Sequence, residues 1–379
     1  MNAAGGATGS SWFQRFLLPG FALKAVIIGG GYATGRELAE YFLASGPWGG
    51  IAGMIFAMLV WSVVAVVTFA YARKVGAYDY RAFFKSLLGP AWLVFEGAYI
   101  LFVVLILAVF GAAAGAIGTA MFGWPAIIGS ALLAISIVIV AALGSNAVER
   151  VFKYVSILLY AVYALLLIFG LFSFGDRIAA GFATPAPSDG WATGGLTYAS
   201  YNIVGAVVIL PVLRHLTSQR DAVIAGLIAG PLTMLPAILF FVCMVAFYPA
   251  IGSETLPSDF LLRQLDMPLF HWAFQLMIFL ALLESGAGSV HAINERISGV
   301  VRARRGHDLG TGARAIISGL LLLLCVFVAD RIGLVALIGS GYRLLAALFL
   351  IVFVLPLLTI GLFRLFRGTT PPLAGDLAS

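Results

Sequence analysis

The sequence predicts an all-α membrane protein with ten transmembrane helices, because it is too apolar for a water-soluble fold and its apolar runs are long. Of its 379 residues, 62% are hydrophobic and only 10% are charged. A mean hydropathy of +1.07 indicates that lipid surrounds most of the chain. Because the bilayer core offers no water to backbone groups, spans must be helices or a closed barrel, and long unbroken runs favour helices.

Apolar runs of about 18 to 34 residues mark the candidate spans. They lie at 17–45, 49–74, 88–119, 124–143, 148–174, 193–213, 221–249, 268–300, 312–329 and 332–365. An even number of spans places both termini on the same side of the membrane. The distribution of Lys and Arg then predicts which side that is.

Lys and Arg are distributed very unevenly between the two sets of connecting segments. If the N-terminus is inside, the cytoplasmic segments hold Arg15, Arg73, Lys74, Arg81, Lys85, Arg150, Lys153, Arg214, Arg220, Arg296, Arg302, Arg304, Arg305, Arg314, Arg364 and Arg367. The outer segments hold only Arg177, Arg263 and Arg331. The positive-inside rule therefore places both termini in the cytoplasm. The net charge of +6 reflects this topology and does not predict a nucleic-acid partner.

Two sets of five spans predict an inverted repeat, because an odd number of spans makes the second set enter from the opposite side. The expected parts are a cytoplasmic N-terminal segment 1–16, a first repeat 17–174, an outer loop 175–192, a second repeat 193–365 and a cytoplasmic tail 366–379. Each repeat opens with a span that glycines and polar residues interrupt. Paired interruptions of this kind are typical of a transporter binding site. The small, polar N-terminus does not look like a cleaved signal peptide.

The first span contains three consecutive glycines, Gly29 to Gly31, where we expect the helix to unwind. Thr34 and Glu37 form a capping-box pattern, which predicts that the helix restarts with Thr34 as its N-cap. The new N-terminus would suit an anionic group, and free carbonyls from Ile28 to Gly31 would suit a cation. The candidate substrate-binding residues here are Gly29, Gly30, Gly31, Tyr32, Thr34 and Arg36. The alternative is that the glycines serve close helix packing.

Charged residues follow this glycine run at membrane depth, where they usually face a cavity or one another. Arg36 and Glu40 are four residues apart, on the same helical face. This pair could equally be a local structural bridge, and Glu37 could act only as the cap.

The sixth span contains a polar cluster, bounded by glycines, that predicts a second unwound segment. Its candidate substrate-binding residues are Tyr198, Ser200, Tyr201 and Asn202, which offer hydrogen-bond donors and acceptors. The alternative is a continuous helix in which hydroxyl groups bond back to their own backbone.

The eighth span carries Glu284 well inside an apolar run, together with Ser285 and Ser289 on one helical face. A carboxylate at this depth is by default a functional candidate, since it can carry a proton or bind a cation. The alternative is a structural salt bridge to Arg36 or another buried base. Glu96 and Arg343 are weaker interior candidates.

Other residues in the spans suggest packing or bending. Gly111, Gly115 and Gly118 predict a close-packed helix face, and Gly339–Gly341 predicts a bend in the long last span. Cys243 and Cys325 lie in apolar runs and predict packing only. The chain has no phosphate loop, His-Glu-x-x-His motif or cysteine pair, so we expect neither an enzyme nor an ATP-driven pump, and no cofactor.

The run from Gly29 to Glu37 resembles the start of the YkvI family of bacterial membrane proteins. More distantly, it is similar to the first helix of LeuT-fold transporters of the amino acid–polyamine–cation superfamily. This resemblance implies a 5+5 inverted-repeat bundle whose unwound first and sixth helices surround the substrate and rock against a scaffold.

In sodium-coupled LeuT-fold proteins, a cation lies between first-helix carbonyls and a short motif of the eighth helix. Ala281 to Ser285 is similar to that motif. The resemblance therefore implies a coupling-ion site at Ile28, Gly31, Ala281, Glu284 and Ser285, with the last three as sodium ligands. Glu284 stands where those proteins have a hydroxyl residue, so the choice between Na⁺ and H⁺ stays open.

The leading hypothesis is a cation- or proton-coupled symporter of the bacterial inner membrane. Its partners would be the lipid bilayer and a small polar solute such as an amino acid, amine or carboxylate. A channel or passive facilitator is the alternative, and the oligomeric state stays open.

Overall fold

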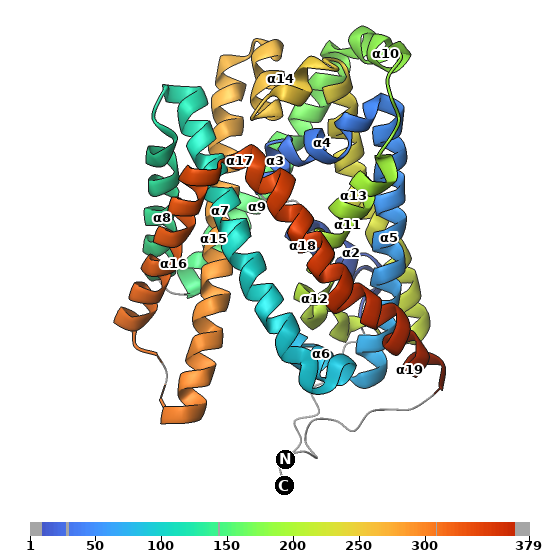
Figure 1. The fold of residues 1–379 in the computed structure, drawn as a ribbon, viewed down its shortest axis with the longest axis vertical. Coiled ribbons are helices and arrows are strands. Elements are labelled where there is room, and N and C mark those ends of the chain that lie inside the picture. Colours follow the sequence, from blue (N-terminus) through green and yellow to red (C-terminus); the bar gives the residue numbers. More distant parts are fainter. Residues whose placement is uncertain (1–9, 28–29, 143–144, 308, 368–379) are drawn as a thin grey trace.

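The computed structural model describes residues 10–27, 30–142, 145–307 and 309–367. Every regular element in these ranges is a helix, and none is a strand, so the predicted all-α class is confirmed. The long helices run side by side between two ends of one bundle (Figure 1).

The first half of the chain begins with short helices and continues with long ones. The helices are α1 (Trp12–Phe16), α2 (Leu18–Ile27), α3 (Gly30–Ala33), α4 (Arg36–Tyr41), η1 (Leu43–Ser45), α5 (Gly46–Val75), α6 (Tyr80–Leu88), η2 (Gly89–Ala91), α7 (Trp92–Phe122), α8 (Ala126–Ala142), α9 (Ser145–Ser173) and α10 (Gly175–Ala183).

The second half repeats this alternation of interrupted and continuous segments. Its helices are α11 (Trp191–Asn202), α12 (Gly205–Val208), η3 (Leu210–His215), α13 (Gln219–Val245), η4 (Ala250–Ser253), α14 (Pro257–Leu265), α15 (Pro268–Arg305), α16 (Thr311–Ile332), α17 (Leu334–Ala336), η5 (Leu337–Gly341), α18 (Tyr342–Phe349), η6 (Leu350–Val354), η7 (Leu357–Gly361) and α19 (Leu362–Arg367). The bend predicted at Gly339–Gly341 falls in η5, where the backbone forms a π-helical turn.

Among the described residues, six helical segments are long and apolar enough to cross a membrane. A seventh exists if α9 and α10 are counted as one span, although the two helices meet at a bend of 73°. The segments 18–27 and 126–140 are apolar but shorter. The chain is therefore a multi-pass membrane protein.

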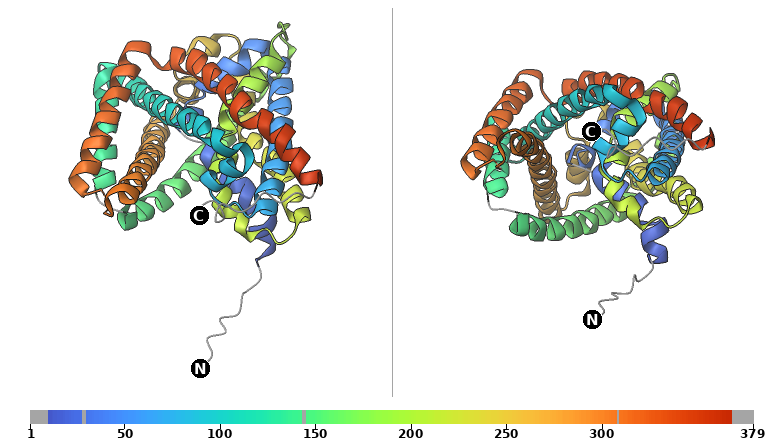
Figure 2. Two further views of the ribbon diagram at one scale, coloured as in Figure 1. Left: turned by 60° about the horizontal axis from the view of Figure 1, so that its bottom comes forward. Right: turned by 90° about the horizontal axis from the view of Figure 1, so that it is seen from below.

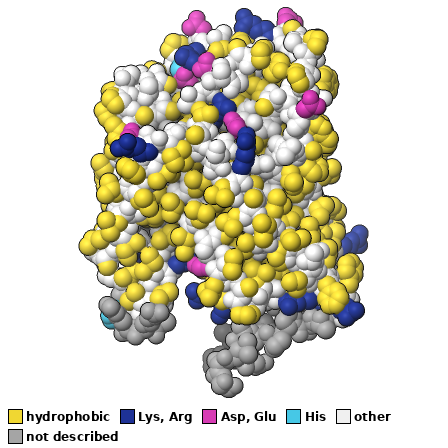
Figure 3. Space-filling model, in the orientation of Figure 1, with side chains coloured by type: hydrophobic (Ala, Val, Ile, Leu, Met, Phe, Trp, Pro, Cys, Tyr) yellow, Lys and Arg dark blue, Asp and Glu magenta, His cyan; other side chains and the backbone are white. Residues whose placement is uncertain are grey.

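The two ends of the bundle differ in charge. One end carries α6, α19 and the start of α13, and the other carries α10 and α14 (Figure 1). Figure 3 shows apolar side chains over the middle of one face, with Lys and Arg side chains along its lower end. We call this lower end the basic end; it includes Arg15, Arg73, Lys74 and Arg364.

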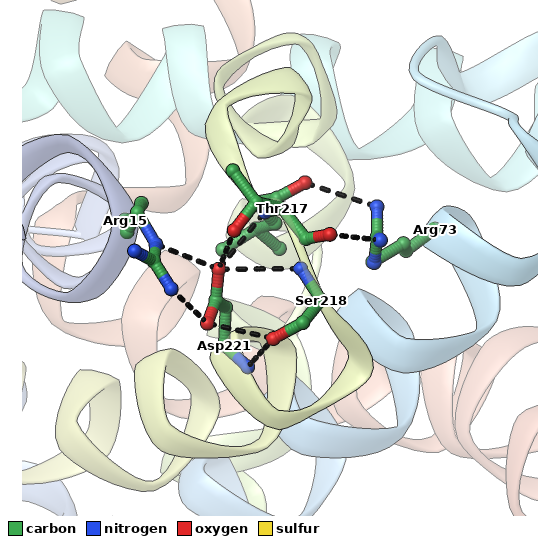
Figure 4. Close-up of polar contacts among 6 residues, drawn as sticks. Arg15, Arg73, Thr217, Ser218 and Asp221 are labelled. Atoms are coloured by element: carbon green, nitrogen blue, oxygen red, sulfur yellow. Dashed lines mark hydrogen bonds and ion pairs between the residues drawn. The ribbon is translucent and has the colours of Figure 1, made fainter. Parts of the chain in front are cut away.

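A hydrogen-bonded cluster at the basic end attaches the N-terminal helix α1 to the bundle (Figure 4). Asp221, only 2% exposed, accepts two hydrogen bonds from Arg15, at 2.8 and 2.7 Å. It also accepts from the backbone and hydroxyl groups of Thr217 and Ser218. Arg73 of α5 donates to the carbonyls of Leu216 and Thr217. The cluster therefore joins α1, α5 and α13.

Viewed along the bundle (Figure 2), α8, α15 and α16 form one side, and α5 and α13 form the other. Helices α5 and α13 contact each other along much of their length, and α11 packs on α5. Glycines bring these helices close together. A Cβ at Gly226 would lie 2.6 Å from the Cα of Val66, and a Cβ at Gly230 would collide with the Met58 carbonyl and the Ser62 hydroxyl. The predicted packing face of α7 is confirmed, since a Cβ at Gly115 would lie 2.6 Å from a carbonyl of α8.

Gly230→Ala tests this close packing of α13 on α5. We expect the free energy of unfolding in detergent to fall by about 1 to 3 kcal/mol, because the added methyl group overpacks a backbone contact. Gly319→Ala in α16 is the matched control, since a Cβ there meets nothing within 4 Å. Equal stability of the two variants would contradict the packing argument.

Candidate substrate site

The first predicted span includes the short helices α2, α3 and α4, and the described part of it is interrupted between α3 and α4. Ile28 and Gly29 lie outside the described residues, and Gly30 and Gly31 begin α3. The described break comes later, at Thr34 and Gly35, where Gly35 has a φ of +78°. Glycine is favoured there because other L-residues are strained in this region, and a Cβ would also lie 2.9 Å from Phe240.

The predicted capping box is wrong. Gly35, not Thr34, is the N-cap of α4, and it makes no side-chain cap bond. Because the cap is one residue later, Leu38 takes the position that Glu37 would need to complete the motif. The Thr34 hydroxyl accepts a hydrogen bond from the Arg36 amide at 3.3 Å. Glu37 lies in the first turn of α4, so the helix already carries its own anion there, and the expected site for an anionic ligand loses its basis.

The interruption predicted within 193–206 is present, but it does not include Tyr198, Ser200, Tyr201 or Asn202, because α11 is helical through Asn202. The Ser200 hydroxyl donates to the Leu196 carbonyl at 2.6 Å, and the Asn202 side chain donates to the Tyr198 carbonyl at 3.1 Å. These local bonds match the alternative in which polar side chains bond back to their own helix. The break follows instead at 203–204, before α12.

A cavity of about 390 Å³ lies where the broken segments meet α7, α15 and α18. The sequence-predicted candidates that line it are Tyr32, Tyr201, Asn202, Glu284 and Ser285. The structure therefore brings together residues of the first, sixth and eighth predicted spans. Thr34, Arg36, Tyr198, Ser200 and Ala281 are buried but do not line it.

Arg36 supports the loop before α14. Its guanidinium donates to the carbonyls of Gly252 and Glu254 at 2.8 and 3.0 Å. It also forms the predicted ion pair with Glu40 at 2.9 Å, which Arg343 joins at 3.1 Å. The proposed alternative pairing of Arg36 with Glu284 is not observed. Glu96 pairs with Arg296 at 3.0 Å, at the wall of a second cavity near the basic end.

Glu37 is the main cavity residue that the sequence did not place among the candidate binding residues, because a role as helix cap explained it equally well. Its side chain lines the cavity, its relative exposure is 5%, and its carboxylate accepts a hydrogen bond of 2.6 Å from the Tyr201 hydroxyl. This bond links α4 to α11 across the two broken segments. The general rule that an ionisable residue inside a membrane faces a cavity or another charge applied to Glu37, but it did not separate this role from that of a cap. Tyr99 and Tyr342, which also line the cavity, carried no comparable signal.

The cavity continues toward the basic end. A second cavity of about 490 Å³ shares Tyr99, Val208 and Ala292 with the first, and its charged lining residues are Asp79, Arg81, Glu295 and Arg296.

Toward the opposite end, the rings of Tyr41, Tyr198 and Tyr201 pack together with centroids 5.7 to 6.3 Å apart. The Tyr41 hydroxyl donates to the Ile338 carbonyl, and this joins α4 to η5. These contacts lie on the side of the site away from the basic end, and the second cavity adjoins it on the other side.

The candidate ion site includes one carboxylate and one hydroxyl side chain. Glu284 and Ser285 line the cavity together with Ile27, and α15 packs on α3. Within the described ranges, no group of three or more His, Cys, Asp or Glu side chains could hold a metal ion. A carboxylate, a hydroxyl and backbone carbonyls are suitable oxygen ligands for a hard cation.

No protein-family model matches this chain. The chain is 23% identical over 337 residues to the uncharacterized membrane protein YkvI of Bacillus subtilis strain 168, covering 86% of this chain and 90% of that protein. A crystal structure of MhsT in complex with L-phenylalanine matches with a TM-score of 0.54 and 17% identity, covering 94% of this chain and 97% of MhsT. A Na⁺-coupled sialic acid symporter, bound to its substrate in an outward-open state, matches with a TM-score of 0.53 and 13% identity, covering 93% and 82%.

The chain shares its fold with these two proteins. MhsT and the sialic acid symporter both have the LeuT fold. The resemblance predicted from the first span, to the YkvI family and to LeuT-fold transporters, is therefore confirmed. At these identities the solved structures show only that the fold is shared.

Tyr201→Phe tests the bond between the two broken segments. We expect the free energy of unfolding to fall by about 1 to 3 kcal/mol, because the buried Glu37 carboxylate loses its hydrogen-bond donor. Tyr160→Phe, at a ring that is 39% exposed, is the control. It should change stability by less than about 0.5 kcal/mol. If both variants unfold at the same temperature, the bond does not stabilise the contact between α4 and α11.

Proposed function

We propose that the chain is a secondary active transporter that moves a small polar solute by alternating access, in symport with Na⁺ or H⁺. The observation that carries the proposal is the central cavity, which lies between two interrupted helices and adjoins a second cavity near the basic end. Interrupted helices around a midplane site are typical of secondary transporters. The fold shared with a Na⁺-coupled symporter supports the same function. We propose that it is a transporter and not an enzyme.

The proposed topology has ten spans in a 5+5 inverted repeat, divided at 17–174 and 193–365. Seven spans pass a test of length and composition if the bent pair is included. The other predicted spans are the two broken segments and the short helix α8, which such a test misses because each piece is short. Arg and Lys gather at the end that carries α1 and α19, so we place both termini in the cytoplasm, with the protein in the bacterial inner membrane.

We assign the solute to the cavity walls formed by Tyr32, Tyr201 and Asn202. The coupling ion is assigned to Glu284 and Ser285, together with backbone carbonyls of the first span. Carboxylate and hydroxyl oxygens could hold Na⁺, and the carboxylate alone could carry a proton.

Flux in proteoliposomes tests the proposal. An ion gradient should drive saturable, uphill uptake of a solute, and uptake should stop when an ionophore dissipates that gradient. A channel or passive facilitator would only let the solute equilibrate. Downhill movement that ignores both gradients would refute coupled transport.

Glu284→Gln tests the coupling assignment. We expect the ion concentration for half-maximal uptake to rise about tenfold or more, which corresponds to about 1.4 kcal/mol of lost ion binding. Asp189→Asn, in an exposed loop, is the control and should leave uptake unchanged. If the Na⁺ and pH dependence of uptake in Glu284→Gln match the wild type, the coupling ion binds elsewhere.

A further inference from the structure

The central cavity has a one-sided charge. Among the described residues that line it, Glu37 and Glu284 are acidic, and none is Lys, Arg or His. In a low-dielectric site inside a membrane, such a lining favours a cation and opposes a second anion.

Three basic side chains from the segments around the cavity, those of Arg36, Arg296 and Lys24, have other partners. Arg36 pairs with Glu40 at 2.9 Å, and Arg296, near the basic end, pairs with Glu96 at 3.0 Å. The Lys24 ammonium lies 4.6 Å from the centroid of the Tyr160 ring. Arg296 lines the adjoining second cavity, and none of these three groups lines the central cavity beside Glu37.

Glu37 is the more deeply buried of the two acids and forms no ion pair within the described part of the chain. Its partner is the neutral hydroxyl of Tyr201. A buried carboxylate without a counter-charge is costly, and a cationic ligand group that enters the cavity would supply that charge.

The walls around Glu37 are aromatic. The aromatic residues that line the cavity are Tyr32, Tyr99, Phe102, Phe110, Tyr201 and Tyr342. Ring faces attract ammonium groups, and the attraction increases when the group is desolvated. A carboxylate among aromatic rings is therefore suited to an organic ammonium ion.

We propose that Glu37 binds the ammonium group of a small organic amine, and that the aromatic wall selects amines over carboxylates and neutral solutes. The cavity volume of about 390 Å³ is in the range of small-molecule sites. This inference rests on the proposed function only in naming the bound amine as the transported solute. An incoming ammonium would take the place of the Tyr201 hydroxyl on the carboxylate or share it, so the contact between α4 and α11 would respond to the ligand.

Ligand-dependent thermal unfolding of the purified full chain in detergent tests the assignment. The amine probes are phenethylamine, 1,5-diaminopentane and tetramethylammonium. For the first two, the neutral matches are 2-phenylethanol and 1,5-pentanediol, and the acidic matches are 3-phenylpropionate and glutarate. We expect at least one amine to raise the midpoint in a saturable way, because a ligand that binds only the native state stabilises it. The alcohols and carboxylates should not.

Variants at Glu37 separate a charge contact from general damage. Glu37→Gln keeps the shape of the side chain and removes its charge, so the apparent Kd of the best amine should rise about tenfold or more, equivalent to about 1.4 kcal/mol. Glu37→Asp keeps the charge and should retain the preference for amines even if the affinity falls. Asp189→Asn, in an exposed loop, controls for the loss of one negative charge and should bind like the wild type. Unliganded midpoints and helical circular dichroism show whether each variant is folded; if Glu37→Gln does not fold, the amine preference of Glu37→Asp decides.

Several results would overturn the assignment: no amine stabilises the wild type, a carboxylate stabilises it as much as its matched amine, or folded Glu37→Gln binds the amine within twofold of the wild type. If amine binding survives in Glu37→Gln while the pH dependence of uptake disappears, Glu37 carries a proton instead. If amines bind through Glu37 but no ion gradient drives their uptake in proteoliposomes, the transport proposal fails and the amine site stands.

Discussion

A helix that breaks inside a membrane must find new partners for the backbone groups that it frees, and this constraint shapes the site. At the first break, the Thr34 carbonyl accepts a hydrogen bond of 2.9 Å from the Ser258 amide of α14, and the Thr34 hydroxyl accepts from the Arg36 amide. Arg36 in turn binds carbonyls of the loop before α14. The same contacts that make the break tolerable in lipid thus hold α4 in the orientation that places Glu37 in the cavity wall.

Small residues allow the second broken segment to reach the first. A Cβ at Gly194 would collide with the Tyr41 carbonyl of α4, and a Cβ at Gly195 would lie 2.5 Å from the Gly53 carbonyl of α5. Because these glycines lack side chains, α11 approaches both helices closely enough for Tyr201 to reach Glu37. Close packing at these glycines therefore allows the hydrogen bond between Tyr201 and Glu37.

Much of the site could be predicted from sequence because lipid makes interrupted helices and buried charges rare. The glycine run, the polar cluster near Tyr201 and the acid Glu284 all stood out for that reason. Tyr32, next to the glycine run, lines the same cavity as Tyr201 and Glu284. The positions of the breaks were less predictable. Capping patterns and glycine propensity are local signals, and the described interruptions lie at 34–35 and 203–204, just after the residues that the local patterns marked.

By itself, the sequence determined the all-α membrane class, the asymmetry of basic residues and the spans that contribute to the site, because these follow from composition and from the cost of exposing polar groups to lipid. Only the tertiary structure decided that Glu37 faces the cavity while Arg36 binds a loop, and that the rings of Tyr41 and Tyr198 pack together. Adjacent residues on a short helix point in directions about 100° apart, so their roles depend on which neighbouring helices pack against each face.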